Sequence, residues 1–317
     1  MKIVYMGTPR FAVEPLKMLI DKGHNIIALV SSPDKPAGRG MNLKASEVKQ
    51  FALSQSIPIM QPEKLRDPQF LHELRSLQAD LFIVVAFRML PEVIWSMPPL
   101  GTINLHASLL PQYRGAAPIN HALINGEKTS GLTTFVISQE IDTGGLLLQR
   151  EVSIDEDETA GQLHDKLMCA GAELLEETVR RIAANDIRPY PQPETPNLKT
   201  APKLTKETSL IKWDRLGEEI RNLVRGLSPY PAAWSELISS DNTAPLQMKI
   251  FKTRAEKTTH QLQAGTIVTD RKTFMKVACA DGFVHIVELQ LAGKKAMSVI
   301  PFLAGFRDID KYHFKKI

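Results

Sequence analysis

Residues 2–31, KIVYMGTPRFAVEPLKMLIDKGHNIIALVS, decide the fold of the first half of the chain. Residues 2–6 form an apolar run typical of a buried strand, and Gly7-Thr8-Pro9 is typical of a turn. Residues 11–22 have the apolar spacing of an amphipathic helix, and residues 25–31 predict a second strand. A strand, a helix and a strand in this order predict a parallel, doubly wound sheet.

Further strands are expected at residues 81–86, 102–106, 133–138 and 146–153, and a closing helix at residues 163–184. The first turn has one glycine, Gly7, where the dinucleotide-binding fingerprint needs three. The second strand leads to Ser31-Ser32-Pro33, without the acidic residue that would hold a ribose. These two observations argue against a nicotinamide cofactor.

The boundary between two domains is expected at a cluster of five prolines within residues 189–202. Proline fixes φ and lacks an amide donor, so this stretch is expected to run extended, as a semi-rigid spacer. The chain of 317 residues is also about twice the usual length of one domain. We therefore expect an α/β domain over residues 1–188, a proline-rich linker over 189–203 and a second domain over 204–317.

The second domain is expected to be a small β-barrel. Short strand-like runs occur at residues 210–213, 233–237, 248–251, 266–268, 274–278 and 284–289, with one helix around residues 216–225. Several short strands and a helix in a domain of this size favour an OB-like barrel, which is a frequent platform for nucleic acid.

The charge of the chain is unevenly distributed. The formal net charge is +4, but residues 1–202 hold 20 Lys and Arg against 23 Asp and Glu, whereas residues 203–317 hold 19 against 12. The two parts therefore carry −3 and +7. A basic half favours association with a polyanion, although a solvated basic surface would show the same composition.

Composition and cysteine usage exclude several classes of protein. The chain is 43% hydrophobic and 23% charged, which is ordinary for a globular protein and not for a disordered or coiled-coil one. Cys169 and Cys279 are far apart and lack neighbouring ligand pairs, which argues against a disulfide framework and a metal site. No apolar run has the length of a signal-peptide core or of a membrane span. We therefore expect a cytoplasmic protein without membrane contact.

Candidate catalytic residues cluster around the strand at 102–106. Asn104 and His106 are two residues apart, so their side chains share one face of that strand. Polar side chains at the carboxyl end of such a strand lie where ligands bind in α/β sheets. Asp142 occupies a glycine-rich turn further along. Each residue alone also has a structural interpretation, since Asp before Thr-Gly-Gly commonly caps a turn.

These residues belong to a longer pattern. Asn104-x-His106, the run from Ser108 to Ile119, and Asp142-Thr143-Gly144 resemble the signature of the folate-dependent formyltransferases. The resemblance extends, in the family's order, to residues 7–12, 33–40 and 292–297, and favours the members that act on methionyl-tRNA. It therefore covers nearly the whole chain.

The resemblance implies formyl transfer from 10-formyltetrahydrofolate to the α-amino group of methionine esterified to initiator tRNA, by a monomer. It implies a Rossmann-like catalytic domain followed by an OB-like tRNA-binding domain. Asn104, His106 and Asp142 match the family's catalytic residues by position. The loop that shapes the folate site is matched by Ser108, Leu109, Leu110 and Pro111.

The resemblance also points to residues that contact tRNA. In the family, a loop corresponding to residues 34–49 inserts into the acceptor stem, which implies contacts from Lys35, Arg39 and Lys44. In the basic second half, Lys206 and the pair Lys294 and Lys295 are expected to contact phosphates, giving affinity more than sequence readout.

Formyl transfer needs side chains of these types. Attack of an amine on the formyl carbon places negative charge on the former carbonyl oxygen, and Asn104 and His106 are suited to stabilise it as donors. Asp142 is suited to accept a proton, directly or through water, and to hold His106 in orientation. No metal ion is needed for this chemistry.

Two other functions remain open at this point. A related formyltransferase acting on a small amine, such as a nucleotide or an amino sugar, would keep the same three residues. A noncatalytic RNA-binding protein on an enzyme scaffold would keep the basic half. The chain also departs from the family at residues 84–91, where Arg88 replaces a small residue and alters the expected wall of the pterin pocket.

Overall fold

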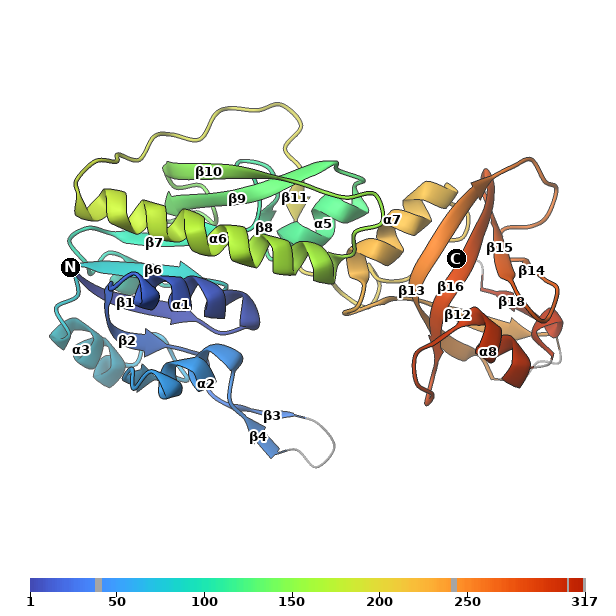
Figure 1. The fold of residues 1–317 in the computed structure, drawn as a ribbon, viewed down its shortest axis with the longest axis horizontal. Helices are drawn as coiled ribbons and strands as arrows, with labels where there is room; N and C mark the ends of the chain where they lie inside the picture. The colour runs from blue at the N-terminus through green and yellow to red at the C-terminus, as the bar shows by residue number, and fades with distance from the viewer. Residues whose placement is uncertain (38–41, 241–243, 307, 316–317) are drawn as a thin grey trace. The chain divides into compact units, whose positions relative to one another are not determined.

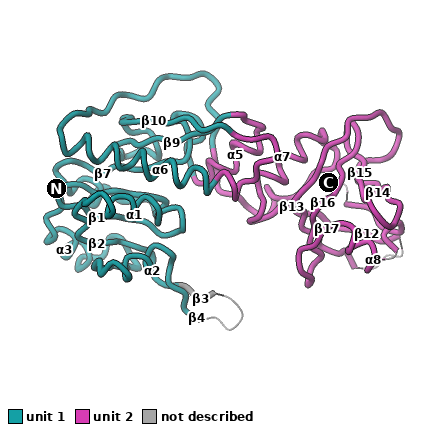
Figure 2. Tube along the Cα trace, viewed as in Figure 1, with its two compact units in different colours: residues 1–115, 129–153, 164–200 teal, residues 116–128, 154–163, 201–317 magenta. Residues whose placement is uncertain are grey.

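The computed structural model describes residues 1–37, 42–240, 244–306 and 308–315 and divides into two compact units, drawn in Figures 1 and 2. Unit 1 comprises residues 1–115, 129–153 and 164–200, and unit 2 comprises residues 116–128, 154–163 and 201–317. In the part of the chain that is described, no helix has both the length and the apolar character needed to cross a membrane.

Unit 1 is built on one mixed sheet. Its strands lie in the order β10 (Leu146–Ser153), β9 (Thr129–Val136), β7 (Thr102–His106), β6 (Leu81–Val85), β1 (Lys2–Gly7), β2 (Asn25–Val30) and β5 (Ile59–Met60). The strands from β5 to β7 pair in parallel, whereas β9 is antiparallel to both β7 and β10. The expectation of a Rossmann-like, mostly parallel sheet is confirmed.

The remaining elements of unit 1 connect and cover these strands (Figure 1). They are η1 (Arg10–Ala12), α1 (Val13–Asp21), the paired strands β3 (Lys35–Ala37) and β4 (Asn42–Lys44), α2 (Glu47–Ser54), α3 (Pro68–Ser76), α4 (Glu92–Trp95), β8 (Arg114–Gly115) and most of α6 (Ala160–Ala183). The long helix α6 matches the expected closing helix.

The two faces of the sheet are covered by different helices. Val4 and Met6 of β1 pack in one buried cluster with Phe70 and Leu74 of α3. On the other face, Gly171 of α6 lies against the side chains of Leu105 and Leu132. Since side chains alternate along a strand, Asn104 and His106 lie on the face opposite α6.

Unit 2 contains an antiparallel sheet that is nearly closed into a barrel. Its strands lie in the order β14 (Ile267–Thr269), β15 (Met275–Cys279), β16 (Gly282–Leu291), β13 (Leu246–Lys257), β12 (Ala233–Ser239) and β18 (Tyr312–Phe314), with β17 (Met297–Ser298) beside β16. A bridge between Thr266 and His313 brings the two ends of this order together. This sheet confirms the expectation of a small barrel.

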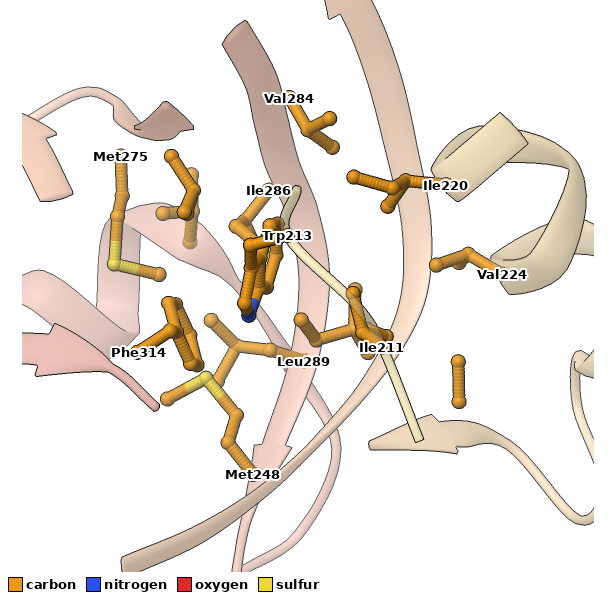
Figure 3. Close-up of a cluster of buried hydrophobic side chains, with 14 of the residues drawn as sticks. Ile211, Trp213, Ile220, Val224, Met248, Met275, Val284, Ile286, Leu289 and Phe314 are labelled. Carbon is orange, nitrogen blue, oxygen red and sulfur yellow. The ribbon is translucent and has the colours of Figure 1, made fainter. Parts of the chain in front are cut away.

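A buried aromatic pair lies in the core of this barrel, shown in Figure 3. The rings of Trp213 and Phe314 lie 4.8 Å apart, and the Trp213 Nε1 donates to Ser235 Oγ at 3.0 Å. Leu210–Trp213 was expected to be a strand. This expectation is wrong, because the segment makes one isolated bridge, between Leu210 and Trp234, and otherwise serves to insert Trp213 into the core.

Unit 2 also includes helices and a segment from the first half of the chain. The helices are α5 (Pro118–Ile124), α7 (Gly217–Leu227), α8 (Val299–Gly305) and η2 (Ile309–Lys311), and β11 (Thr200–Ala201) spans the boundary. α7 packs closely on α5, since a Cβ at Gly226 would lie 2.7 Å from a side-chain carbon of Ile124. Asn120 fixes this contact by donating to the Gly226 carbonyl at 2.7 Å. Residues 116–128 therefore group with the barrel.

Candidate functional site

Asn104 and His106 are placed by β7, the strand next to the antiparallel edge of the sheet. Asn104 pairs in register with Phe135 and His106 with Thr133 of β9. The His106 ring lies edge-on to the Phe135 ring, with centroids 6.5 Å apart, and only 7% of its side chain is exposed. Both side chains are therefore held on one face by a buried strand.

Asp142 lies in the turn between β9 and β10, with its side chain next to that of His106. Its Oδ2 lies 3.8 Å from His106 Nδ1 and accepts a hydrogen bond from the Gly115 amide at 2.9 Å. Asp142 has a φ of 54°, a left-handed conformation that aspartate adopts more readily than most residues. The turn predicted from Asp-Thr-Gly-Gly thus directs its carboxylate to the histidine.

The His106 ring is oriented by a backbone carbonyl as well as by Asp142. Its Nε2 lies 3.0 Å from the Tyr113 oxygen, and because a carbonyl only accepts, Nε2 carries the proton. This leaves Nδ1 facing Asp142, across a distance longer than a hydrogen bond. Asp142 was expected to hold His106 in orientation, and the structure adds the hydrogen bond that Nε2 donates to the Tyr113 carbonyl.

Asn104 carries an unsatisfied buried atom. Its Oδ1 is shielded from solvent and has no hydrogen-bond partner among the described residues. A buried polar atom without a partner carries a free-energy cost that a ligand with a suitable donor would remove. Asn104 therefore fits a site that binds a polar ligand.

The loop Ser108–Pro111 follows β7 and is rigidly held. Ser108 Oγ donates to the Gln112 carbonyl at 2.7 Å, and Thr133 Oγ1 donates to the Ser108 carbonyl at 2.7 Å. Gln149 donates to the Leu110 carbonyl at 2.8 Å. Ser108, Leu110 and Pro111 are buried and Leu109 is half-buried, so the loop has a fixed shape next to His106.

Gln192, in the proline-rich segment, supports the same site and was not identified from the sequence. Its amide nitrogen donates to the carbonyls of Asp142 at 2.8 Å and Gly144 at 2.9 Å. Its Oε1 accepts from Arg114 at 2.5 Å. A glutamine between prolines has no periodicity or motif that would mark it, and only the spatial contact reveals its role.

Arg88 has a structural role. Its guanidinium donates to the carbonyls of Pro62 and Glu63 at 2.8 and 3.0 Å and lies 5.2 Å from the centre of the Phe87 ring. Burial lowers the pKa of this guanidinium from its ordinary value. The departure from the family pattern at this position thus fastens a neighbouring turn.

All the residues expected to contact tRNA except Arg39 lie in the described ranges. Lys44, at the end of β4, is exposed, and Lys35 begins β3. Arg39 lies outside the described residues. Lys206, Lys294 and Lys295 are exposed in unit 2, with the Lys206 Nζ 4.9 Å from the centre of the Trp234 ring.

No cluster of three or more His, Cys, Asp or Glu side chains that could hold a metal ion occurs among residues whose placement is described. The site around His106 offers hydrogen-bond donors, an imidazole and a carboxylate. Such groups are suited to stabilising charge on an oxygen and to moving a proton.

Comparison with known proteins identifies the family. Residues 1–179 match the model of the formyl transferase family, and residues 203–307 match the model of the formyl transferase C-terminal domain. The chain belongs to the formyl transferase family. Among curated relatives of this formyl transferase, the methionyl-tRNA formyltransferase of Bacteroides thetaiotaomicron is 51% identical over 315 residues, covering 98% of each chain.

Solved structures show the same fold at lower identity. An N-formyltransferase from Helicobacter canadensis, in complex with folinic acid and dTDP-3-aminofucose, matches 90% of this formyl transferase and 98% of its own chain, with a TM-score of 0.65 and 20% identity. HypX from Aquifex aeolicus, in complex with tetrahydrofolic acid, matches 96% of this chain and 47% of its own, with a TM-score of 0.64 and 16% identity.

Replacement of Gly144 by alanine tests how tightly the Asp142 turn packs on β9. A Cβ at Gly144 would lie 1.7 Å from the Val136 carbonyl oxygen, and backbone cannot move aside cheaply. We expect Gly144→Ala to destabilise unit 1 by about 3 kcal/mol, at the upper end of overpacking costs. Differential scanning calorimetry of the full chain measures the shift in melting temperature.

Gly305→Ala is the matched control, because nothing lies within 4 Å of its added methyl group. It should change stability by less than about 1 kcal/mol. A Gly144→Ala protein that melts like the Gly305→Ala protein would contradict the packing of this turn.

Proposed function

We propose that this protein transfers the formyl group of 10-formyltetrahydrofolate to the α-amino group of methionine esterified to initiator tRNA. The observation that carries the proposal is the 51% identity to a methionyl-tRNA formyltransferase over 98% of both chains. Such identity across both halves favours the same substrate as well as the same reaction class. We further propose that the protein acts in the cytoplasm as a monomer.

The residues around Asn104 fit a folate co-substrate. The Asn104 Oδ1 is buried and has no partner among the described residues. The loop Ser108–Pro111, which follows the same strand, has a fixed shape, and we propose that it flanks the bound folate. When bound, the folate supplies the formyl group. The protein supplies the groups that hold the formyl oxygen and take up the proton of the attacking amine. As the new C–N bond forms, the bond from the formyl carbon to the folate nitrogen breaks, and a proton passes to that leaving nitrogen.

Asn104 and His106 are the proposed donors to the formyl oxygen. The Asn104 amide N–H is suited to stabilise negative charge that develops there, and one such donor contributes about 3 to 4 kcal/mol. In His106, Nε2 already donates to the Tyr113 carbonyl, so the ring would donate to the formyl oxygen through Nδ1 once that nitrogen carries a proton. The 7% exposure of the ring strengthens these electrostatic interactions, because water does not screen them.

Asp142 is the proposed proton acceptor. Its Oδ2 accepts a hydrogen bond from the Gly115 amide, which holds the carboxylate in place. The 3.8 Å between Oδ2 and His106 Nδ1 is too long for a direct hydrogen bond, and a water or the substrate amine between them would complete the path. The α-amine of an amino acid titrates near about 7.7 to 8.0, so a useful fraction is neutral without a strong base.

We propose that tRNA is held by both parts of the chain. The catalytic domain is assigned to residues 1–188, the linker to 189–203 and the tRNA-binding domain to 204–317. The exposed Lys44, Lys206, Lys294 and Lys295, together with Lys35 and Arg39, are the proposed phosphate contacts. Such contacts release counterions, so binding should weaken steeply as salt rises.

The alternative is formylation of a small amine, since a solved sugar N-formyltransferase shares the fold. At 20% identity this likeness concerns the fold alone. The basic composition of residues 203–317 favours tRNA over a small amine. A noncatalytic RNA-binding protein is disfavoured because Asn104, His106 and Asp142 are all present.

Incubation with 10-formyltetrahydrofolate and either methionyl-tRNA or a panel of amino sugars and aminonucleotides tests the substrate. We expect formyl-methionine on the tRNA and at least about 100-fold less product from any small amine, as a site built for tRNA contacts predicts. Mass spectrometry of the products provides the measurement. Transfer to a small amine alone would support the alternative, and binding of tRNA without transfer would support the noncatalytic protein.

Asn104→Ala and Asp142→Asn test the catalytic assignment. Removal of one donor to a developing oxyanion lowers kcat by about 10² to 10³, and we expect this for Asn104→Ala. Asp142→Asn keeps the shape and removes the charge, and should lower kcat by about 10² or more. Both variants should bind tRNA as the wild type does in filter binding, with Lys22→Ala as a surface control. Full turnover with weakened tRNA binding would contradict the assignment.

Arg39→Ala tests the proposed tRNA-contacting loop. Loss of one phosphate contact should weaken tRNA binding and reduce the slope of log K against log salt by about 1. Folate affinity, measured separately by fluorescence titration, should stay unchanged. An equal loss of folate and tRNA affinity would show that Arg39 acts on the fold of the loop instead.

A further inference from the structure

Unit 2 contains a cavity of about 350 Å³ beside α7, whose lining includes Arg221, Arg225, Phe251 and Thr253. None of these residues takes part in the site on β7. We infer that this cavity binds a phosphoryl group, held by Arg225 and Thr253.

Arg221 is fully engaged by the protein. Its guanidinium makes ion pairs with Asp157 at 2.7 Å and Glu218 at 2.6 Å, and donates to the Glu156 carbonyl at 2.6 Å. These bonds clamp the acidic run at residues 155–158 to α7. Arg221 therefore forms a wall of the cavity, and its charge is already compensated.

Arg225 lies one turn further along α7 and is not compensated in this way. It is 6% exposed, and its polar contacts are neutral: Nε donates to Asn222 Oδ1 at 2.7 Å, and Nη1 reaches the Glu158 carbonyl at 3.4 Å. Within the described ranges it makes no ion pair. A buried charge without a counterion is costly, so an anion in the cavity would stabilise it.

The electrostatic surroundings of Arg225 agree with this interpretation. Burial lowers the pKa of its guanidinium, and the positive charge of Arg221 lowers that pKa further. The carboxylates of Glu218, Asp157 and Glu158 act in the opposite direction without reversing the shift. Asp157 also lines the cavity, where its carboxylate is paired with Arg221.

Thr253 supports the proposed phosphoryl site independently of Arg225. It is 5% exposed and lines the cavity, yet its Oγ1 is without a hydrogen-bond partner in the described structure. The pairing of β13 with β16 shifts register on both sides of Lys252, and such bulges redirect side chains near binding sites. Thr253 thus brings to the cavity wall a buried hydroxyl that no described protein group satisfies.

The donor set fits a phosphoryl group. A guanidinium presents parallel N–H donors that match two phosphoryl oxygens, and a hydroxyl donates to a third. Lys252 is exposed at the cavity and adds a further positive charge. Val224 and Phe251 provide apolar contact for the organic group that carries the phosphate. A backbone phosphate of RNA and a small phosphate ester share this chemistry.

Titration of inorganic phosphate into the full-length protein, at constant ionic strength in chloride, tests the site by calorimetry. We expect saturable binding of one phosphate. Arg225→Met should weaken it by about tenfold or more, as loss of a charged hydrogen bond predicts. The control Arg271→Met, at an exposed arginine paired with Asp310 in the same unit, should bind phosphate like the wild type.

Thr253→Val separates binding from folding. Because its hydroxyl is unpaired in the protein, its replacement by a methyl group should leave the melting temperature unchanged or raise it. The same change should weaken phosphate binding by about threefold or more, as loss of a neutral hydrogen bond predicts. Absence of saturable phosphate binding, or wild-type affinity in Thr253→Val, would overturn the inference even if Arg225→Met fails to fold.

A second arm distinguishes the sources of the phosphate and does not depend on the proposed reaction. If the site takes an RNA backbone phosphate, Thr253→Val should weaken tRNA binding and inorganic phosphate should compete with tRNA. If it takes a small phosphate ester, the wild type and Thr253→Val should bind tRNA with the same affinity, whereas glycerol phosphate should compete with inorganic phosphate. Either result supports a phosphoryl site and assigns its source.

Discussion

Two segments that are distant from Asp142 in the sequence meet around this residue. Its Oδ2 accepts from the Gly115 amide and faces His106 Nδ1 at 3.8 Å, while Gln192 holds the backbone of the same turn. The left-handed φ of Asp142 directs its carboxylate toward His106, and the close packing of Gly144 on the Val136 backbone fixes the position of the turn. The relative positions of the candidate catalytic groups therefore depend on this one partly buried carboxylate and on the segments that surround it.

The proline-rich segment contributes more than a connection between domains. Prolines lack an amide donor, so the hydrogen bonds that hold this segment come from the residues between them. Tyr190 exchanges two backbone hydrogen bonds with Leu146, Gln192 binds the Asp142 turn, and the Lys199 carbonyl accepts from the Tyr113 amide. Since the Tyr113 carbonyl in turn accepts from His106, the segment supports both the histidine and the aspartate. Extended chain with fixed φ is well suited to this, because little conformational entropy is lost when it docks.

The sequence predicted the elements that consist of continuous apolar runs, such as β1 and β6, because an unbroken run of apolar residues indicates burial without any need for tertiary information. It did not predict α2 or α3, which bury few residues and begin at the polar caps Ser46 and Asp67. Among site residues, Asn104 and His106 were predicted to share a face from their spacing. Asp142 was matched through the family pattern, and the contacts of Gln192 and Tyr113 could not be predicted because tertiary packing creates them.

The charge division along the sequence changes when the folded units replace the two halves. Residues 154–163 contain four acidic side chains, Asp155 to Glu158, and group with unit 2. Unit 2 thus holds 20 Lys and Arg against 17 Asp and Glu, a net +3, and unit 1 carries +1. Arg221 is one of these cations, and its charge is matched by Asp157 and Glu218. Attraction of a polyanion therefore depends on the cations that remain without partners. Among these, a buried arginine such as Arg225 is held in place before an anion binds, so it loses less conformational entropy on binding than an exposed lysine does.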